Sequence, residues 1–286
     1  MIGQYLARDL IGHIAIFQAV MLLILVSNIY FIHRKRRHKL PSKLPKVSIM
    51  VPARNEEAGI EACVISLLAQ TYPDFELLVL DDQSTDATLE ILLQLSQQSS
   101  RMKVLMGLPE MPDLSGKNWA CAQLAEQATG DLFFFTDADT VHQPEALAAI
   151  VSAMLGEKAD LMTGFPHQVV RTWGERLLVP FFSWASLNFI PFGLAYWLRS
   201  TALTIAVGQV MVFTRSAYLM VGGHAALGRN ILDDIVLARR IQSAKLNWRI
   251  LHISDLVSCR MYRSSRDAVE GLTKNLFGAF GCRLLP

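Results

Sequence analysis

The segment DLFFFTDADT, from Asp131 to Thr140, decides the fold of this chain. Its first half is a short apolar run rich in aromatic residues, which is typical of a buried strand. Asp137 and Asp139 follow directly, two residues apart, so both side chains can point toward one site. An Asp-x-Asp pair alone is a weak pattern, because it occurs by chance in turns. Its position at the end of a buried strand is what makes it informative.

Strand-like and helix-like segments alternate on the N-terminal side of this motif and directly after it. We expect strands at 47–51, 75–80, 103–106 and 131–136, and helices at 59–70, 85–98, 119–127 and 144–155. This alternation predicts an α/β fold with a mostly parallel sheet and right-handed crossovers. In such sheets ligands bind beyond the carboxyl ends of the strands.

Acidic or other polar side chains gather at three of these strand ends, after Pro52, after Leu80 and after Thr136. The residues are Arg54, Asn55 and Glu56, then Asp81 and Asp82, then Asp137 and Asp139. An alternative for LDDQSTD (80–86) is helix capping by Ser84 or Thr85, with Asp86 at the positive helix end. Capping leaves the two adjacent aspartates unexplained, since buried carboxylates require a donor or a cation. Two carboxylates at one site favour Mg²⁺ or Mn²⁺.

Composition limits the class of protein. The 286 residues carry 27 Lys+Arg against 25 Asp+Glu, a formal charge of +2, which excludes a nucleic-acid binder that works by bulk charge. Charged residues make up 18%, against roughly 25% in soluble domains. The mean hydropathy is +0.30, so a purely soluble enzyme is not expected. The four cysteines form no CxxC pair and are expected to be buried thiols.

An apolar run of 23 residues, Leu10 to Ile32, is long enough to span a bilayer. The basic run HRKRRHK (33–39) follows it, and the positive-inside rule then places the rest of the chain in the cytoplasm. A nucleic-acid patch is the alternative for the basic run, but its place beside an apolar helix favours anionic lipid headgroups. We expect an anchor at 1–33 and a basic linker at 34–46.

Three further patterns are candidates for the site. Asp233 and Asp234 open a predicted helix, where they either complement its dipole or supply a general base. Arg260 and Arg263 stand at i and i+3, which share one face if the segment is helical, and could neutralise a diphosphate. Lys117 lies beside a glycine and suits a nucleotide contact, although the spacing of a P-loop is absent.

The segment Leu177–Leu198 is also free of formal charge over 22 residues. A single span there would put Asp234 and Asp137 on opposite sides of the membrane, and Pro180 and Pro191 interrupt a straight helix. We therefore expect broken helices in the membrane interface, with a buried helical hairpin as the alternative. The aromatic residues expected to face lipid are Phe181, Phe182, Trp184, Phe189, Phe192, Tyr196 and Trp197.

The ordered set SIMVPARNEE, LDDQSTD, GKNWA, TDADT, VGGH and LDDIVLARR resembles the family 2 glycosyltransferases, over about 47–274. The resemblance implies a GT-A nucleotide-sugar-binding fold in a cytoplasmic domain at 47–275, with a tail at 276–286. It also implies that Asp137 and Asp139 hold Mg²⁺ or Mn²⁺ with the diphosphate, and that Asp234 is the base. Pro52, Arg54, Glu56, Asp81, Asp82 and Lys117 would border the nucleoside of a nucleotide diphosphate sugar, with a UDP-sugar favoured.

The segment RMYRSSRDAVEGLTKNLF, with GKNWA, is most similar to the branch that glycosylates polyisoprenoid lipids such as carotenoids and hopanoids. Polymer synthesis is not expected, because the Gln-x-x-Arg-Trp motif of processive synthases is missing. Members of that branch usually continue into C-terminal membrane helices, whereas this sequence ends at Pro286. The expectation is that either the protein is a shortened form or its acceptor site is incomplete.

The sequence thus predicts a membrane-anchored, inverting enzyme that moves one sugar to a lipid hydroxyl. Two alternatives stay open: a polyprenyl-phosphate sugar transferase, and a non-catalytic membrane protein that binds sugar nucleotides.

Overall fold

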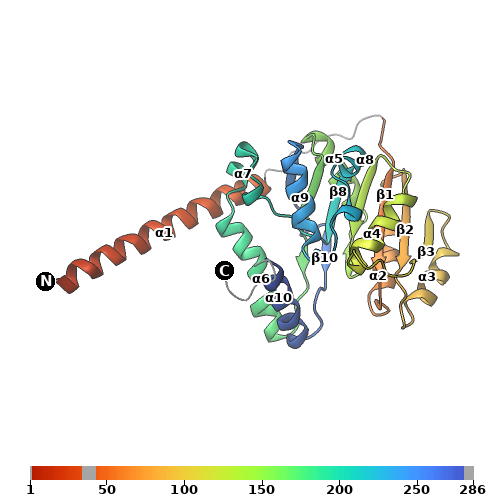
Figure 1. Ribbon diagram of the computed structural model, residues 1–286, viewed down its shortest axis with the longest axis horizontal. Helices are drawn as coiled ribbons and strands as arrows, with labels where there is room; N and C mark the ends of the chain where they lie inside the picture. The colour runs from red at the N-terminus through yellow and green to blue at the C-terminus, as the bar shows by residue number, and fades with distance from the viewer. Residues whose placement is uncertain (1, 34–42, 280–286) are drawn as a thin grey trace.

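A computed structural model describes residues 2–33 and 43–279 of the chain. Its centre is a seven-stranded sheet with helices on both faces (Figure 1). Across the sheet the strands are β3 (Met102–Met106), β2 (Phe75–Asp81), β1 (Val47–Ala53), β4 (Leu132–Thr136), β8 (Val210–Thr214), β6 (Leu161–Phe165) and β9 (Trp248–His252). All neighbours pair in parallel except β8, which is antiparallel to both β4 and β6. The expected mostly parallel α/β fold is confirmed.

The helices follow the predicted order, with ends that shift by up to three residues. They are α1 (Ile2–His33), α2 (Ile60–Leu68), α3 (Thr88–Ser96), α4 (Gly116–Gln127), α5 (Ala146–Gly156), α6 (Trp173–Phe189), α7 (Phe192–Leu198), α8 (Arg215–Met220), α9 (Asp233–Ser243) and α10 (Ser265–Ala279). Two short 3₁₀ turns, η1 (Thr201–Leu203) and η2 (His224–Ala226), complete the described helical elements. α10 continues past the expected domain end at 275.

The central strands are apolar on both faces because helices cover both sides of the sheet. In β1, Val47, Ile49 and Val51 pack into one core with α2, α3 and α5, whereas Met50 faces a second core with α4 and α9. All four side chains are fully buried. Parallel pairing brings the carboxyl ends of β1, β2 and β4 to one edge of the sheet, where their polar loops meet.

A smaller sheet of β5 (Thr140–His142), β10 (Val257–Cys259) and β7 (His167–Gln168) lies beside this edge. It corrects one expectation: Arg260 and Arg263 lie in a loop between β10 and α10, not on a helix. The i, i+3 argument therefore does not apply to them. Cys63, Cys121 and Cys259 are buried thiols as expected, and Cys282 lies outside the described residues.

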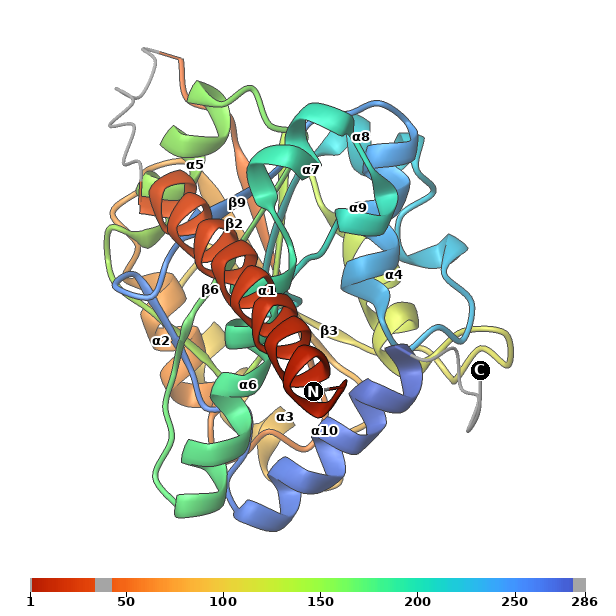
Figure 2. The ribbon, with the colours of Figure 1, turned by 90° about the vertical axis from the view of Figure 1, so that its left-hand side faces the viewer.

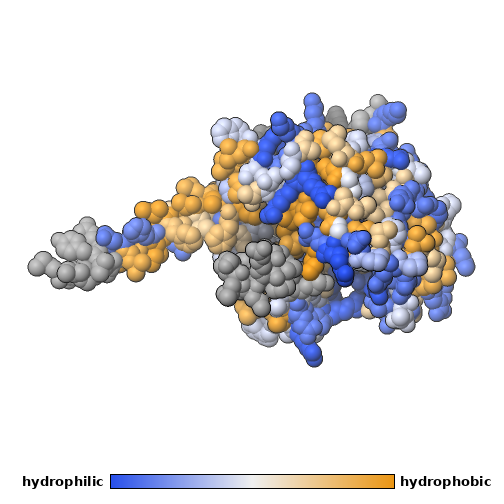
Figure 3. All heavy atoms as spheres, in the orientation of Figure 1, coloured by the Kyte–Doolittle hydropathy of each residue, from blue (hydrophilic) through white to orange (hydrophobic). Residues whose placement is uncertain are grey.

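The N-terminal helix α1 projects from the body, and its C-terminal end lies across α6 and α7 (Figures 1 and 2). Residues Asp9–Ile32 are long and apolar enough to cross a membrane, and the space-filling view shows their apolar surface (Figure 3). Of the basic run at 33–39, only His33, the last residue of α1, is among the described residues.

The segment predicted as broken helices is indeed bent, by 57° between α6 and α7. Its exposed side chains include Trp197 at 79% and Leu177 at 77%, which argues against a buried hairpin. Two of the aromatic residues expected to face lipid do not. Phe192 is fully buried, and the ring of Tyr196 packs edge-on against Trp248 at 5.2 Å, because α7 also covers the second core, which contains α4 and α9.

Candidate active site

The loops after β1 and β2 interlock through their polar side chains. Asn55 Oδ1 accepts a hydrogen bond from the Thr85 amide at 2.8 Å, and the Asn55 amide donates to Ser84 Oγ at 3.0 Å. Asn55 has a φ of 57°, a left-handed conformation that asparagine tolerates better than most residues. Ser84 and Thr85 therefore join two loops, and the helix-capping role considered for them is wrong: α3 starts only at Thr88.

A cavity of about 340 Å³ lies beyond these loops, and six ionisable side chains dominate its lining. We call it the charged cavity; it is lined by Pro52, Ala53, Arg54, Glu56, Asp82, Gly116, Lys117, Ala120, Asp137, Ala138 and Asp139. Arg54 Nη1 lies 3.6 Å from Asp82 Oδ2 on its wall. The sequence predicted seven of these residues for the site.

The start of α4 forms part of this wall. Ser115 caps the helix by accepting the Asn118 amide, so Gly116 and Lys117 stand in its first turn. A side chain at 116 would meet Asp82 Oδ2 at 3.3 Å, so glycine lets the helix end approach the cavity closely. The positive end of a helix dipole favours an anion at this place.

Two carboxylates in the charged cavity, Asp139 and Glu56, form no ion pair among the described residues, whereas Asp137 and Asp82 pair with Lys117 and Arg54. Burial, and then the charge of Asp137, raises the pKa of Asp139 to about 6. Burial, and then Asp139 and Asp137, raises the pKa of Glu56 to about 7. Asp139 Oδ1 is buried and has no hydrogen-bond partner among the described residues.

These features fit a divalent cation held by Asp137 and Asp139, whose hard oxygens suit Mg²⁺ or Mn²⁺. Within the described residues, no three His, Cys, Asp or Glu side chains form a complete metal cluster. The remaining ligands would have to come from a substrate and water.

Buried hydroxyl groups hold the loop that carries Asp137 and Asp139. Thr140 Oγ1 donates to the Asp137 carbonyl at 2.7 Å, and Thr136 Oγ1 donates to the Gln209 carbonyl at 2.7 Å. His142 Nε2 lies 3.0 Å from Thr140 Oγ1, and burial lowers the pKa of His142 to about 3, so the ring is neutral. With both hydroxyl protons already donated, Nε2 is the donor. The network fixes the loop without adding charge.

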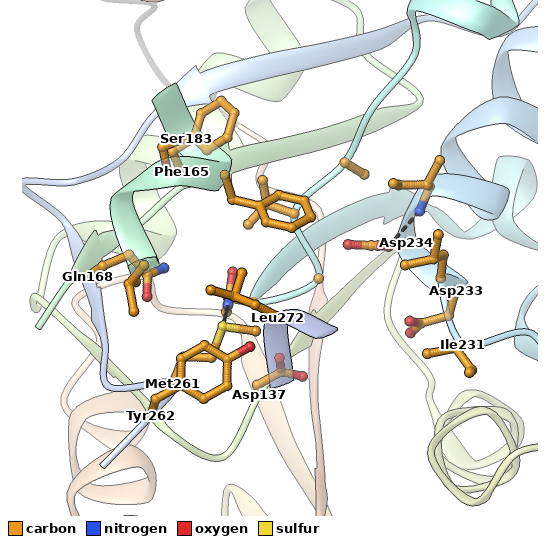
Figure 4. A pocket seen from close by; sticks show the side chains of 18 of the residues that line it. Asp137, Phe165, Gln168, Ser183, Ile231, Asp233, Asp234, Met261, Tyr262 and Leu272 are labelled. Atoms are coloured by element: carbon orange, nitrogen blue, oxygen red, sulfur yellow. Dashed lines mark hydrogen bonds between the residues drawn. The ribbon is translucent and has the colours of Figure 1, made fainter. Parts of the chain in front are cut away.

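A second cavity, of about 300 Å³, lies between α6, α9, α10 and the loop before β8 (Figure 4). We call it the apolar cavity. Its lining comprises Lys117, Asp137, Phe165, Gln168, Val179, Phe182, Ser183, Ala206, Val207, Gly208, Gln209, Ile231, Leu232, Asp233, Asp234, Ile235, Met261, Tyr262 and Leu272. Figure 4 shows Asp233 and Asp234 on one side and Gln168 and Ser183 on the opposite side.

The two cavities share a wall made of Lys117 and Asp137. Lys117 Nζ lies 2.8 Å from Asp137 Oδ1 and 3.9 Å from Asp233 Oδ2, so it connects the carboxylates of both cavities. Gly208 stands at the same place: a methyl group there would lie 3.5 Å from Asp234 Oδ2 and 3.7 Å from Lys117 Nζ. A molecule in the charged cavity can therefore meet one in the apolar cavity here.

Asp234 is the carboxylate best suited to accept a proton in the apolar cavity. Burial, and then the neighbouring Asp233, raises its pKa from 3.8 to about 7. Asp234 Oδ1 accepts the Ile235 amide at 2.7 Å, which orients the side chain at the start of α9. A carboxylate with a pKa near neutrality is a far better base than an ordinary aspartate.

Three expected site residues lie outside both linings. Asp81 is buried below the charged cavity, where its Oδ2 accepts the Ser84 amide at 3.2 Å. Arg263 Nη2 approaches Gly59, and its charge partly offsets the raised pKa of Glu56. Arg260 donates its backbone amide to the Asp139 carbonyl at 3.2 Å. Neither arginine lines either cavity, and their role in neutralising a diphosphate stays a prediction.

Sequence reasoning missed the polar residues of the apolar cavity, chiefly Gln168, Gln209 and Tyr262. Gln168 Oε1 is buried without a hydrogen-bond partner among the described residues. Gln168 and Gln209 lie in segments without a motif, and Tyr262 stands between Arg260 and Arg263 but was not itself predicted for the site.

The sequence profile of Glycosyl transferase family 2 matches residues 48–219, more than half of the chain. The chain belongs to this family. It is 28% identical over 238 residues to a 4,4'-diaponeurosporenoate glycosyltransferase of Staphylococcus haemolyticus, covering 80% of this chain and 60% of the relative. The protein of that name from Staphylococcus aureus is 26% identical over 84% of this chain and 64% of its own length. The chain thus spans less than two thirds of these relatives.

Solved structures support the GT-A fold. A mannosyltransferase from Pyrobaculum calidifontis, in complex with GDP-Man and Mn²⁺, superposes with a TM-score of 0.61 at 21% identity, covering 87% of this chain and 66% of that one. Glucosyl-3-phosphoglycerate synthase from Mycobacterium tuberculosis, in complex with Mn²⁺ and UDP, gives 0.52 at 21% identity, covering 82% and 85%.

Proposed function

We propose that this protein transfers one sugar from a nucleotide diphosphate sugar to the hydroxyl group of a lipid, with inversion at the anomeric carbon. The observation that carries the proposal is the shared wall. A carboxylate-lined cavity at the strand ends meets an apolar cavity at Lys117 and Asp137, and a carboxylate with a raised pKa stands on the apolar side.

The donor would bind in the charged cavity. The diphosphate fits the first turn of α4, where the helix dipole and Lys117 offer positive charge, and Arg54 and Asp82 line the side left for the nucleoside. Asp137 and Asp139 would hold Mg²⁺ or Mn²⁺, which offsets the charge that grows on the departing diphosphate. UDP and GDP sugars both suit this cavity, and we favour a UDP-sugar.

The acceptor would bind in the apolar cavity with its hydroxyl next to Asp234. Asp234 takes the hydroxyl proton as the oxygen attacks the anomeric carbon, and the bond from that carbon to the diphosphate breaks in the same displacement. A single displacement from the face opposite the leaving group inverts the configuration. Lys117 stands beside the diphosphate and balances its charge.

A lipid is the acceptor class that the second cavity fits best. Its lining is largely aliphatic and aromatic, and Val179, Phe182 and Ser183 come from α6, whose outer face is exposed and apolar. The relatives named for diaponeurosporenoate glycosylation support a long polyisoprenoid chain.

The polyprenyl-phosphate alternative is less well supported. Lys117 is the sole cationic residue among the described residues that line the apolar cavity, and it already pairs with Asp137. A phosphate acceptor next to Asp233 and Asp234 would meet repulsion without compensation. A non-catalytic role would not require the raised pKa of Asp234.

We further propose that α1 anchors the enzyme in the cell membrane as a single span at 1–33, with the linker 34–46 and the catalytic domain on the cytoplasmic side. α6 and α7 would lie in the membrane interface, where they place the apolar cavity at the level of the lipid.

The test is to incubate membranes containing the protein with labelled UDP- and GDP-sugars and to extract the lipids. We expect one labelled sugar to enter an alkali-stable lipid glycoside, only with Mg²⁺ or Mn²⁺, and at a rate about 10²–10⁴-fold lower with Asp234→Asn. Label in a lipid phosphate, or donor hydrolysis with no labelled lipid for the whole panel, would contradict the proposal.

A further inference from the structure

The bend between α6 and α7 releases backbone groups from helical hydrogen bonding. α6 ends at Phe189, and Ile190 and Pro191 are extended before α7 begins. Pro191 has no amide hydrogen, and the amide of Phe192, in the first turn of α7, has no intrahelical partner. In water these groups would be solvated, but in a lipid environment each must find a partner within the protein.

Asn28 of α1 supplies those partners. Its Nδ2 donates to the Leu187 carbonyl at 2.8 Å and to the Ile190 carbonyl at 2.7 Å, and its Oδ1 accepts the Phe192 amide at 2.9 Å. The Asn28 side chain is 0% exposed. One amide from the membrane helix thus satisfies two carbonyls and one amide across the break.

Two other polar residues of the apolar part of α1, Gln18 and His13, behave differently. Gln18 is exposed on the surface of the helix, and His13 Nδ1 lies 2.6 Å from the Asp9 carbonyl of its own helix. Asn28 differs from both residues, because it is buried and its side chain bonds to the backbone of another segment. Its amide is placed against one specific backbone feature.

The contact around Asn28 continues into the catalytic domain. Phe31 packs edge-on against Tyr196 at 6.3 Å, and a methyl group at Gly193 would overlap the Phe31 ring. The hydroxyl of Tyr196 accepts the Ile250 amide of β9 at 3.1 Å. α1, α7 and the central sheet are thereby joined into one packed unit.

The same contact reaches the apolar cavity through α6. Val179, Phe182 and Ser183 form the α6 part of its lining, and Leu187 lies one helical turn beyond Ser183. Since Asn28 fixes the carbonyl of Leu187, the position of this wall depends on the hydrogen bonds made by the membrane helix.

We propose that Asn28 is a positioning residue for the acceptor: α1 holds the α6–α7 bend, and so the α6 wall of the apolar cavity, in addition to anchoring the protein. This inference rests on the proposed function insofar as it assigns the cavity to the lipid acceptor. It predicts that replacing Asn28 changes the use of a lipid acceptor and leaves the charged cavity unaffected.

A distance measurement tests the structural half. Spin labels at Leu177→Cys and Trp197→Cys, both exposed, report the α6–α7 geometry in full-length protein in phosphatidylglycerol-containing vesicles. Cys282→Ser removes the thiol outside the described residues, and the other three cysteines are buried. We expect one narrow distance distribution in this background, a broad or shifted one with Asn28→Leu, and no change with the matched control Gln18→Leu.

A kinetic comparison tests the functional half, with a long-chain polyprenol in the vesicles and the short soluble alcohol geraniol as acceptors. Asn28→Leu should lower kcat/KM for the polyprenol by about 10–100-fold, the scale expected from misplacing a reactant by about 1 Å. The donor KM and turnover of geraniol should stay within about twofold of wild type. Gln18→Leu should match wild type throughout.

Should Asn28→Leu fail to insert into vesicles, Gly193→Ala tests the same contact, and Phe31→Ala in the same chain should restore the narrow distance. An unchanged distance in Asn28→Leu, or equal losses for both acceptors, would overturn the positioning role. If the wild type labels no lipid at all, the proposed function fails, and the distance measurement still decides whether Asn28 holds the bend.

Discussion

The charged cavity and the apolar cavity are built in opposite ways. The charged cavity is assembled at the ends of three neighbouring parallel strands, so its residues stand in short motifs directly after apolar runs. The apolar cavity takes its residues from α6, α9, α10, β6, β7 and the loop before β8, which are far apart in the chain. Local sequence therefore indicates the charged cavity, whereas the apolar cavity forms only when distant segments pack together.

This difference leads to a division of labour that mutations can test. Substitutions in the charged cavity should weaken donor binding and therefore also sugar transfer. Changes in the apolar cavity should affect the acceptor and leave donor binding intact. Lys117 and Asp137 line both cavities, so their replacement should affect donor binding and acceptor use together.

The largest effect is expected from the carboxylates of the charged cavity. Asp137→Ala or Asp139→Ala should abolish transfer, because the diphosphate loses the cation that offsets its charge. Excess EDTA should do the same to the wild-type enzyme. Thermal unfolding should change little, since partly exposed carboxylates at a strand end contribute little to stability. Full turnover in EDTA would contradict the metal assignment.

Replacement of Asp234 should have the next largest effect, and it should slow the reaction with the acceptor without weakening donor binding. Asp234→Asn keeps the shape but cannot accept a proton, so kcat should fall about 10²–10⁴-fold with the donor KM nearly unchanged. Asp233→Asn is the matched control on the same helix turn and should be milder. Equal losses in the two variants would instead favour a helix-dipole role for both residues.

The pH dependence sharpens the same assignment. A base acts when deprotonated, and burial raises the pKa of Asp234 to about 7, so kcat/KM for the acceptor should rise with pH up to about 7 and then level off. An unperturbed aspartate, with a pKa near 3.8, would give a flat profile over this range. The rising limb should be absent from the residual activity of Asp234→Asn; its persistence there would assign the limb to another group.

A smaller effect is expected from replacing the exposed aromatic residues of α6 and α7 that are proposed to contact lipid. Trp197→Glu or Trp184→Glu should raise KM for a long-chain polyprenol about threefold to tenfold and leave KM for a short soluble alcohol unchanged. Partial burial of an aromatic side chain in lipid is worth on the order of 1 kcal/mol, which sets this scale. Leu93→Glu on α3, an exposed leucine far along the sheet, is the control. A uniform rise in both acceptor KM values would argue against contact with lipid.

The strand-end residues could be predicted because local sequence and sheet topology act together there. One apolar run is followed by Asp137 and Asp139, and another is followed by Asp82. Once the two strands belong to the same parallel sheet, these side chains must lie at the same edge of it. Asp234 at the start of α9 was predictable for a similar reason, since it opens a helix whose apolar face is clear.

The sequence could not predict features that depend on contacts between residues far apart in the chain. Phe192 and Tyr196 belong to an exposed-looking aromatic segment, yet they pack into the catalytic domain because α7 folds back over the sheet. Arg260 and Arg263 leave the helical pattern because the small sheet ends only at Cys259. The partners of Asn28 lie about 160 residues away along the chain, and no local pattern indicates them.

The division of labour between the two cavities is tested most directly by nucleotide binding to two matched variants. Titration calorimetry with UDP and with GDP, each in the presence of Mn²⁺, should show that Asp139→Asn loses binding while Asp234→Asn binds like the wild type, although its kcat is about 10²–10⁴-fold lower. Loss of binding in both variants, or retention in both, would contradict the assignment of donor and acceptor to separate cavities.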